Sequence, residues 1–169
     1  MGGAGGGWPL RLIVLLHGLD MVEVSRVADL LAEHGERFLA RCFTSGERAY
    51  AEGQPRRRAE HLAARFAAKE AVLKALGTGL SGGIAWTEIE VTRDGSGAPG
   101  LRLTGVAAAR ARSLGVRSWA VSLTHTAALA AASVVGEVPA RRKRAERAAT
   151  SPARARRAKR SSKRGSRRS

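Results

Sequence analysis

Cysteine and aromatic residues are scarce in this chain. It has one cysteine, Cys42, in 169 residues, and only 4% of its residues are aromatic. A single cysteine excludes an internal disulfide framework and a cysteine-rich zinc site. No neighbouring residue indicates an activated thiolate, so we expect Cys42 to be a small buried apolar side chain. Because 44% of the residues are hydrophobic, the core should be substantial and mostly aliphatic.

Long hydrophobic runs are also absent. The apolar run at 12–16 is much shorter than the roughly 20 residues that cross a bilayer. No small-residue cleavage site of a signal peptide follows it. We interpret residues 10–18 as a buried strand. The sequence therefore predicts no transmembrane segment and a cytoplasmic location.

Positive charge is abundant at one end of the chain only. The net charge is +16, but residues 141–169 hold 14 Lys and Arg against Glu146 alone, which leaves +3 for the rest of the chain. We predict a flexible Gly-rich leader over 1–9, one folded domain over 10–137 and a disordered basic tail over 138–169.

The basic tail raises an alternative function, that of a nucleic-acid- or polyanion-binding protein. A dense run of cations binds polyphosphates without sequence specificity and with a strong salt dependence. No base-reading fold, zinc module or set of stacking aromatic residues accompanies the tail. This alternative therefore rests on charge alone.

The folded segment begins with helical patterns. Apolar residues recur at helical spacing over 23–34, and residues 38–43 indicate a further helical turn. Thr44 stands three residues before Glu47, as in a capping box that opens a short helix. The longest helical pattern covers about 56–76 and ends at a glycine.

Strand patterns follow the long helix. They cover 84–91, 101–103, 119–123 and 129–135, and a small Ala-rich helix is expected over 105–114. The sequence therefore predicts an α+β fold, in which an antiparallel sheet packs against one long and several short helices.

The end of the long helix carries a possible cation and phosphate site. Glu70 and Lys74 lie four residues apart, and Gly77 begins a Gly-Thr-Gly turn whose backbone amides can approach a phosphate. The alternative is a surface ion pair worth a few tenths of a kcal/mol. Both side chains border the apolar face rather than the solvated one, which weighs against that alternative. Lys69 intrudes into the apolar face, so its ammonium must reach solvent or find a partner.

Asp20 offers a second carboxylate after the first predicted strand. Taken alone, Asp20 is better explained as the cap of a helix that begins near Val22, because Asp is a favoured N-cap residue. Carboxylates and phosphate oxygens together are the usual ligands of Mg²⁺. His125 stands between two threonines at a predicted hairpin, where a hydrogen-bonded structural histidine is the default and a ligand-binding one the minority interpretation.

Four segments, taken in order, resemble one family. They are Gly-Leu-Asp-Met-Val-Glu (18–23) with Arg26, Phe38 to Thr44 with Glu47, Arg-Phe-Ala-Ala-Lys-Glu-Ala (65–71) with Lys-Ala-Leu-Gly-Thr-Gly (74–79), and Val-Ser-Leu-Thr-His-Thr (121–126). Over about residues 10–137 the chain resembles bacterial holo-(acyl-carrier-protein) synthase, the small single-domain type of the 4′-phosphopantetheinyl transferase superfamily. It departs from that family at Gly97-Ala98-Pro99, where Gly-Lys-Pro is usual, and in its basic tail.

The resemblance implies the 4′-phosphopantetheinyl transferase fold and a magnesium-dependent transfer. The phosphopantetheine arm of coenzyme A would pass to a serine of apo acyl carrier protein, with release of adenosine 3′,5′-bisphosphate. Asp20 and Glu70 match the family's magnesium carboxylates and catalytic acids. We expect Glu70 to accept the serine proton, directly or through water. Lys74 matches a lysine that contacts coenzyme A phosphate, and we expect Gly77 to help bind this substrate.

The resemblance also implies how coenzyme A, the carrier protein and further subunits are bound. Arg65 and His125 match positions at or near the coenzyme A site. Arg26, with Arg37 and Arg41 nearby, would form a basic edge on which an acidic carrier protein docks. Small members of the family form trimers with active sites between subunits, so the resemblance implies a homotrimer.

Overall fold

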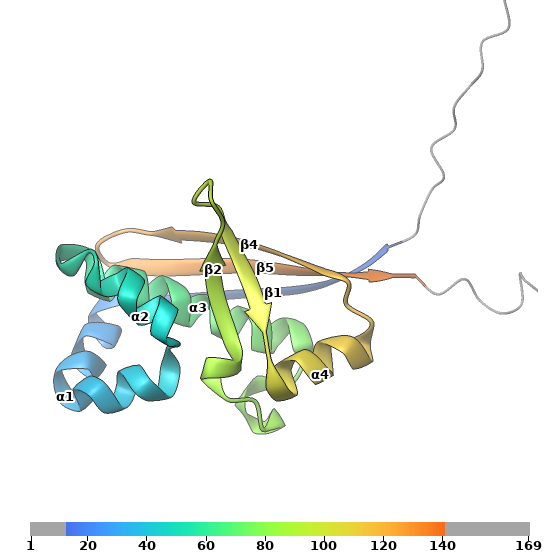
Figure 1. Ribbon diagram of the computed structural model, residues 1–169, viewed down its shortest axis with the longest axis horizontal. Helices are drawn as coiled ribbons and strands as arrows, with labels where there is room; N and C mark the ends of the chain where they lie inside the picture. The colour runs from blue at the N-terminus through green and yellow to red at the C-terminus, as the bar shows by residue number, and fades with distance from the viewer. Residues whose placement is uncertain (1–12, 141–169) are drawn as a thin grey trace, which may run out of the picture. The chain divides into compact units, whose positions relative to one another are not determined.

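The structure is a computed structural model and describes residues 13–140. Within this part of the chain (Figure 1), the helices and strands follow each other as β1 (Ile13–Glu23), α1 (Val24–Cys42), α2 (Ser45–Glu52), α3 (Arg58–Leu76), β2 (Ile89–Arg93), β3 (Pro99–Leu103), α4 (Gly105–Leu114), β4 (Ser118–His125) and β5 (Leu129–Pro139). Short 3₁₀ helices cover Pro55–Arg57, Gly79–Gly82 and Trp86–Glu88.

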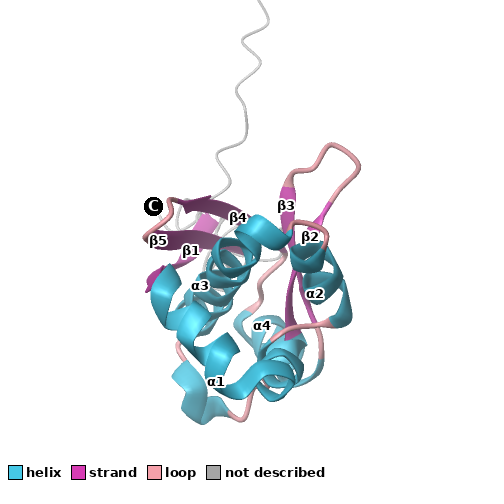
Figure 2. Cartoon of the chain, turned by 90° about the vertical axis from the view of Figure 1, so that its left-hand side faces the viewer, coloured by secondary structure: helices cyan, strands magenta, loops and turns pink. Residues whose placement is uncertain are grey.

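The strands form two antiparallel sheets. One has the order β1-β5-β4 and the other pairs β2 with β3. The helix α3 is central, because it packs against the three-stranded sheet and also contacts α1, α2 and β2 (Figure 2). Side chains alternate across a strand, and Ala130, Ala132 and Val134 of β5 are accordingly buried against the helix side. The predicted α+β fold with antiparallel pairing is confirmed.

Several element bounds differ from the predictions. The patterns at 23–34 and 38–43 belong to one helix, α1, which is kinked at Gly35, where φ is +46°. The strand predicted over 84–91 begins only at Ile89, because a 3₁₀ turn precedes it. The carbonyl oxygen of Trp86 in that turn accepts a hydrogen bond from Lys69 of α3. This carbonyl group therefore bonds to a side chain of α3 instead of to a neighbouring strand.

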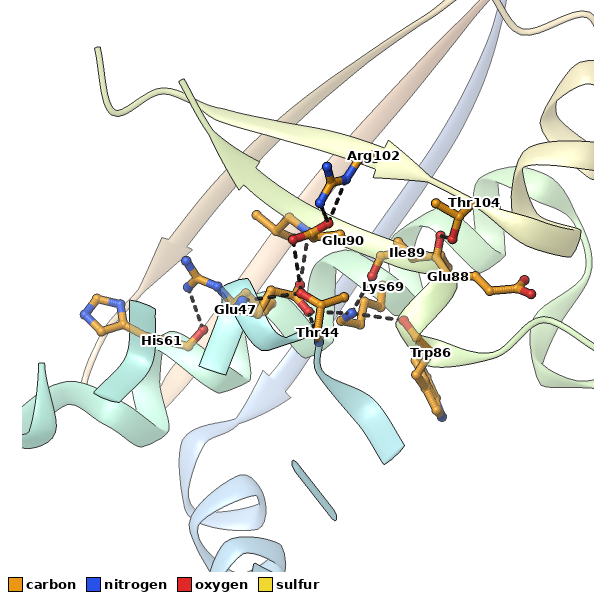
Figure 3. A network of polar contacts seen from close by, with 12 residues as sticks. Thr44, Glu47, His61, Lys69, Trp86, Glu88, Ile89, Glu90, Arg102 and Thr104 are labelled. Carbon is orange, nitrogen blue, oxygen red and sulfur yellow. Dashed lines mark hydrogen bonds and ion pairs between the residues drawn. The ribbon is translucent and has the colours of Figure 1, made fainter. Parts of the chain in front are cut away.

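A buried ion pair joins α2 to α3. The Lys69 ammonium is fully buried and lies 2.8 Å from a carboxylate oxygen of Glu47. It also donates to the carbonyl oxygens of Trp86 and Ile89 (Figure 3). Glu47 completes the predicted capping box with Thr44 at the start of α2. Glu47 is thus the partner that the place of Lys69 on an apolar face required. Through Lys69, α3 is connected to α2, to the 3₁₀ helix Trp86–Glu88 and to β2.

No helix in the range 13–140 is long and apolar enough to cross a membrane. The predicted leader, the first residues of the strand predicted from residue 10, and the tail beyond residue 140 with its polyanion contacts lie outside the described residues. The last strand ends at Pro139.

Candidate active site

The backbones of β1 and α3 touch at Gly18. A β-carbon at this position would lie 1.8 Å from the carbonyl oxygen of Ala71 and 3.0 Å from the amide nitrogen of Ala75. Only glycine permits this approach, because the contact is with backbone atoms that cannot move aside. Asp20 shares the helix-facing side of β1 with Gly18, since side chains alternate along a strand. The approach therefore brings the Asp20 carboxylate to the surface of α3.

Asp20 pairs with Lys74 across the two elements. The Lys74 ammonium lies 2.8 Å from Oδ1 of Asp20 and 3.0 Å from the carbonyl oxygen of Leu19. The Asp20 side chain is 15% exposed and that of Lys74 is 53% exposed. The alternative of a surface pair between Lys74 and Glu70 is wrong, because Lys74 directs its ion pair to β1 instead.

The capping role considered for Asp20 is also wrong. Asp20 lies within β1, opposite Ala132 of β5, and the strand continues to Glu23. The helix α1 starts at Val24, whose amide donates to the carbonyl oxygen of Ala128 at 2.9 Å. Pairing with β5 thus extends β1 by five residues beyond its predicted end at residue 18. The Asp20 carboxylate is therefore not used to cap α1 and is available to the site.

Glu70 lies in the same electrostatic neighbourhood. Burial, followed by the negative charge of Asp20, raises the pKa of the Glu70 carboxyl, while the positive charges of Lys74 and Arg26 act in the opposite direction. The two predicted carboxylates therefore interact electrostatically across the contact between β1 and α3. Half-burial of Glu70 strengthens this interaction, because nearby water screens it less.

The donor set fits magnesium. No group of three or more His, Cys, Asp and Glu side chains within residues 13–140 is arranged to hold a metal ion, so a closed protein cage is not found there. Mg²⁺ is usually held by one or two carboxylates, with substrate phosphates and water completing the shell. Asp20 and Glu70 supply two carboxylates of this kind beside a lysine.

The turn after α3 differs in detail from the expectation. Gly77 ends the helix with φ +68°, and its amide donates to the carbonyl oxygens of Leu73 and Lys74. The Thr78 amide donates to the Leu73 carbonyl oxygen at 3.2 Å. These amides serve the helix cap, so Gly77 contributes its left-handed turn and its lack of a side chain rather than an available N–H.

Arg65 and His125 belong to a second group of side chains, which is connected through His61: its carbonyl oxygen accepts a hydrogen bond from Arg65, and its ring centroid lies 5.4 Å from that of His125. Arg65 is only 2% exposed, and its guanidinium carbon lies 4.0 Å from the centroid of the Tyr50 ring. Its Nε is buried without a hydrogen-bond partner in the described part of the chain. His125, at the end of β4, lies 3.1 Å from a carboxylate oxygen of Glu60 and 3.2 Å from the Arg57 guanidinium. The predicted hairpin after His125 is present.

The two groups lie on different stretches of α3. Glu60, which contacts His125, and Glu70 are ten residues apart, which corresponds to about 15 Å along a helix. One chain therefore brings Asp20, Glu70 and Lys74 together but does not place His125 beside them. Sequence reasoning missed Arg57 and Glu60 as partners of His125, although their spacing of three residues is that of a helical ion pair.

The predicted docking arginines are exposed on α1. Arg26 lies in the first turn of the helix, and Arg37 and Arg41 follow the kink. The charge of Arg26 also acts on Glu70, which places the beginning of α1 beside the site. Of the three arginines, Arg26 is the one whose charge is among the causes that act on the pKa of the Glu70 carboxyl.

The fold and the site together are typical of enzymes that transfer a phosphate-containing group with the help of a divalent cation. The chain belongs to the 4′-phosphopantetheinyl transferase superfamily, whose family model matches residues 17–131. The predicted family is thereby confirmed.

Individual relatives agree with the family match. The chain is 51% identical over 135 residues to holo-(acyl-carrier-protein) synthase of Chloroflexus aggregans, over 74% of this chain and 96% of the relative. It is similar to the crystal structure of the synthase from Neisseria meningitidis, with a TM-score of 0.65 and 28% identity over 71% of this chain and 95% of that one. The Bacillus anthracis synthase in complex with CoA (3′,5′-ADP) gives a TM-score of 0.62 and 32% identity, over 75% and 99% of the two chains. The nucleic-acid alternative has no support among these relatives.

Proposed function

We propose that this protein transfers the 4′-phosphopantetheine arm of coenzyme A to a serine hydroxyl of an apo acyl carrier protein, with release of adenosine 3′,5′-bisphosphate. The observation that carries the proposal is the meeting of Asp20 and Glu70, from β1 and α3, beside the Lys74 ammonium. The family and the names of the relatives support it, and the Bacillus anthracis relative is a complex with CoA.

Asp20 and Glu70 would hold Mg²⁺. When bound, this cation would neutralise charge that develops on the pyrophosphate of coenzyme A. Lys74 would hold a phosphate oxygen by a charge-assisted hydrogen bond. The nucleophile belongs to the carrier protein, so the enzyme needs no activated serine or cysteine of its own. We assign the acceptance of the serine proton to Glu70, directly or through water.

The second group, with Arg65, Arg57 and His125, would bind another phosphate of coenzyme A. The buried Nε of Arg65 lacks a partner among residues 13–140, and a bound anion would supply one. His125, beside Arg57, would contribute at the rim. The left-handed turn at Gly77 would leave room for the substrate next to Lys74.

A homotrimer with active sites between subunits is part of the proposal. Such an arrangement would let His125 of one subunit approach Lys74 of another, which a single chain does not achieve. The face of β1 that points away from α3 supports self-association, because Leu15, Leu19 and Met21 are each more than half exposed there. Exposed apolar patches of this kind commonly mark interaction surfaces.

The carrier protein would dock on the exposed side of α1. Arg26, Arg37 and Arg41 offer positive charge to an acidic partner, and such rim charges mainly raise the association rate and set the orientation. Docking at Arg26 would bring the acceptor serine to the carboxylates. A cytoplasmic location is the remaining part of the proposal.

The test is an intact-mass measurement of a carrier protein. Purified full-length protein is incubated with apo acyl carrier protein, coenzyme A and Mg²⁺, and the phosphopantetheine adduct is expected. Asp20→Asn and Glu70→Gln should each slow its formation at least a hundredfold, whereas Asp29→Asn, at an exposed site on α1, should not. Absence of the adduct with acyl and peptidyl carrier proteins alike would overturn the proposal.

A further inference from the structure

The Lys74 ammonium lies at a carboxylate that the proposed function assigns to a metal ion. It contacts Oδ1 of Asp20 at 2.8 Å and the carbonyl oxygen of Leu19 at 3.0 Å. Two cations cannot share the same carboxylate oxygen closely without strong mutual repulsion. Metal ligation by this oxygen, at about 2.0–2.1 Å for Mg²⁺, would therefore favour withdrawal of the ammonium.

We infer that Lys74 competes with the divalent cation for Asp20 and is released toward phosphate when the cation binds. The inference rests on the proposed function and adds a second role for Lys74. In the metal-free protein, Lys74 stands in for the missing cation. In the metal-bound protein, its ammonium is available for a phosphate oxygen of the substrate.

The side chain of Lys74 is suited to such a release. It is 53% exposed and reaches Asp20 by a long flexible stem from the last turn of α3. Lys69, five residues earlier on the same helix, provides a contrast. Lys69 is fully buried and held by Glu47 and by the carbonyl oxygens of Trp86 and Ile89. Lys69 is therefore fixed in the core by contacts to several elements. Lys74 is held at the surface by its contacts to Leu19 and Asp20 of β1 alone, among the contacts of the described residues.

The metal-free protein also has a physical need for this pair. The Asp20 side chain is 15% exposed, and a largely buried carboxylate without a partner is destabilising. The Lys74 ammonium supplies this partner and directs the Asp20 carboxylate toward α3. A cation that binds at this carboxylate must therefore displace the lysine from it.

Coupling between metal and phosphate follows from the competition. A cation that releases Lys74 raises the affinity of the protein for a phosphate ligand. By linkage, the phosphate ligand raises the affinity for the cation by the same factor. Direct contact between cation and phosphate adds to this coupling, so the contribution of Lys74 is isolated by measuring the cation alone.

The experiment is a Mn²⁺ titration of the full-length protein without nucleotide, followed by electron paramagnetic resonance of the free ion. Lys74→Met removes the charge and keeps most of the apolar stem. We expect it to bind Mn²⁺ about tenfold more tightly than the wild type, which corresponds to the loss of one charge-assisted hydrogen bond at the competing site. The matched control is Arg26→Met, because the charge of Arg26 acts on Glu70 but Arg26 has no ion pair with Asp20 among the described residues. This control should change the affinity less than threefold.

Two results would overturn the inference. In the first, Lys74→Met binds Mn²⁺ as the wild type does. In the second, Arg26→Met gains as much affinity as Lys74→Met, which reduces the effect to net charge. Asp20→Asn separates this failure from that of the proposed function. If the wild type binds no Mn²⁺, or Asp20→Asn binds it equally well, then the metal site itself is absent and both proposals fail.

A second titration uses adenosine 3′,5′-bisphosphate with and without Mn²⁺. The wild type should gain more nucleotide affinity from the metal than Lys74→Met gains. An equal gain in the two proteins would contradict the release of Lys74.

Discussion

Gly18 carries the sharpest structural prediction, because its substitution should move one half of the site away from the other. In Gly18→Ala the new methyl carbon would start 1.8 Å from the Ala71 carbonyl oxygen. Contacts of this type do not fall below 3.0 Å, so β1 must retreat from α3 by more than about an ångström. Overpacking of a core costs roughly 1–3 kcal/mol, and we expect the upper end because the obstacle is backbone.

Two assays measure the effect of Gly18→Ala. Thermal unfolding should show a lower Tm, by about 10 °C if roughly 3 kcal/mol is lost from a domain of this size. Mn²⁺ affinity should fall at least tenfold, because Mg²⁺-type coordination tolerates little displacement of its ligands. The displacement would be that of Asp20 relative to Glu70.

The control for this prediction is Gly136→Ala on β5. A β-carbon there would meet the ring of Trp119 at 2.8 Å, which is a side chain that can turn aside. Gly136→Ala should therefore lose some stability while it keeps its Mn²⁺ affinity. The reasoning is refuted if Gly18→Ala retains both the Tm and the Mn²⁺ affinity of the wild type.

The remaining predictions concern charge, docking, the core and assembly. Glu70→Gln should raise the Tm of the metal-free protein at pH values above about 4.5, the ordinary pKa of this carboxyl. Because the pKa of Glu70 is raised in the folded state, the folded protein retains a proton that the unfolded chain has already released. The wild type therefore loses stability as the pH rises from about 4.5 through the raised pKa, and the variant does not. Scanning fluorimetry in EDTA checks this, and a lower Tm at neutral pH would contradict it. Arg26→Glu should raise the KM for carrier protein well above any change in the KM for coenzyme A, and equal changes would refute the docking assignment. Lys69→Met should lower the unfolding free energy in urea by about 3–5 kcal/mol, because Glu47 is left as an unpaired buried charge; a loss below about 1 kcal/mol would argue against a buried ion pair. Leu19→Glu should convert a trimer to monomers in sedimentation and abolish transfer, whereas an active wild-type monomer would exclude the interface.

Local signals determine much of this fold and could be read from the sequence. The helix predicted over 105–114 has these bounds in α4, because a left-handed glycine, Gly115, ends it. The capping box of Thr44 and Glu47 is also a local device and was predicted from its spacing. In both cases the residues that decide the structure lie within one helical turn of each other.

Long-range contacts explain what the sequence did not reveal. Asp20 and Lys74 are 54 residues apart, and their pairing depends on the backbone approach at Gly18. The extension of β1 to Glu23 depends on β5, more than 100 residues later in the chain. Without knowledge of that pairing, capping of a helix was the more economical interpretation of Asp20. The family resemblance pointed to Asp20, Glu70 and Lys74, but it did not reveal the backbone contact at Gly18 that brings β1 and α3 together.

The account's central claim is that Asp20 of β1 and Glu70 of α3 form one site for a divalent cation. The most direct measurement is Mn²⁺ binding to the full-length wild type, Asp20→Asn, Glu70→Gln and the control Asp29→Asn. The account predicts one Mn²⁺ per chain for the wild type and the control, and a large loss of affinity for each site variant. Wild-type affinity in both Asp20→Asn and Glu70→Gln would contradict it.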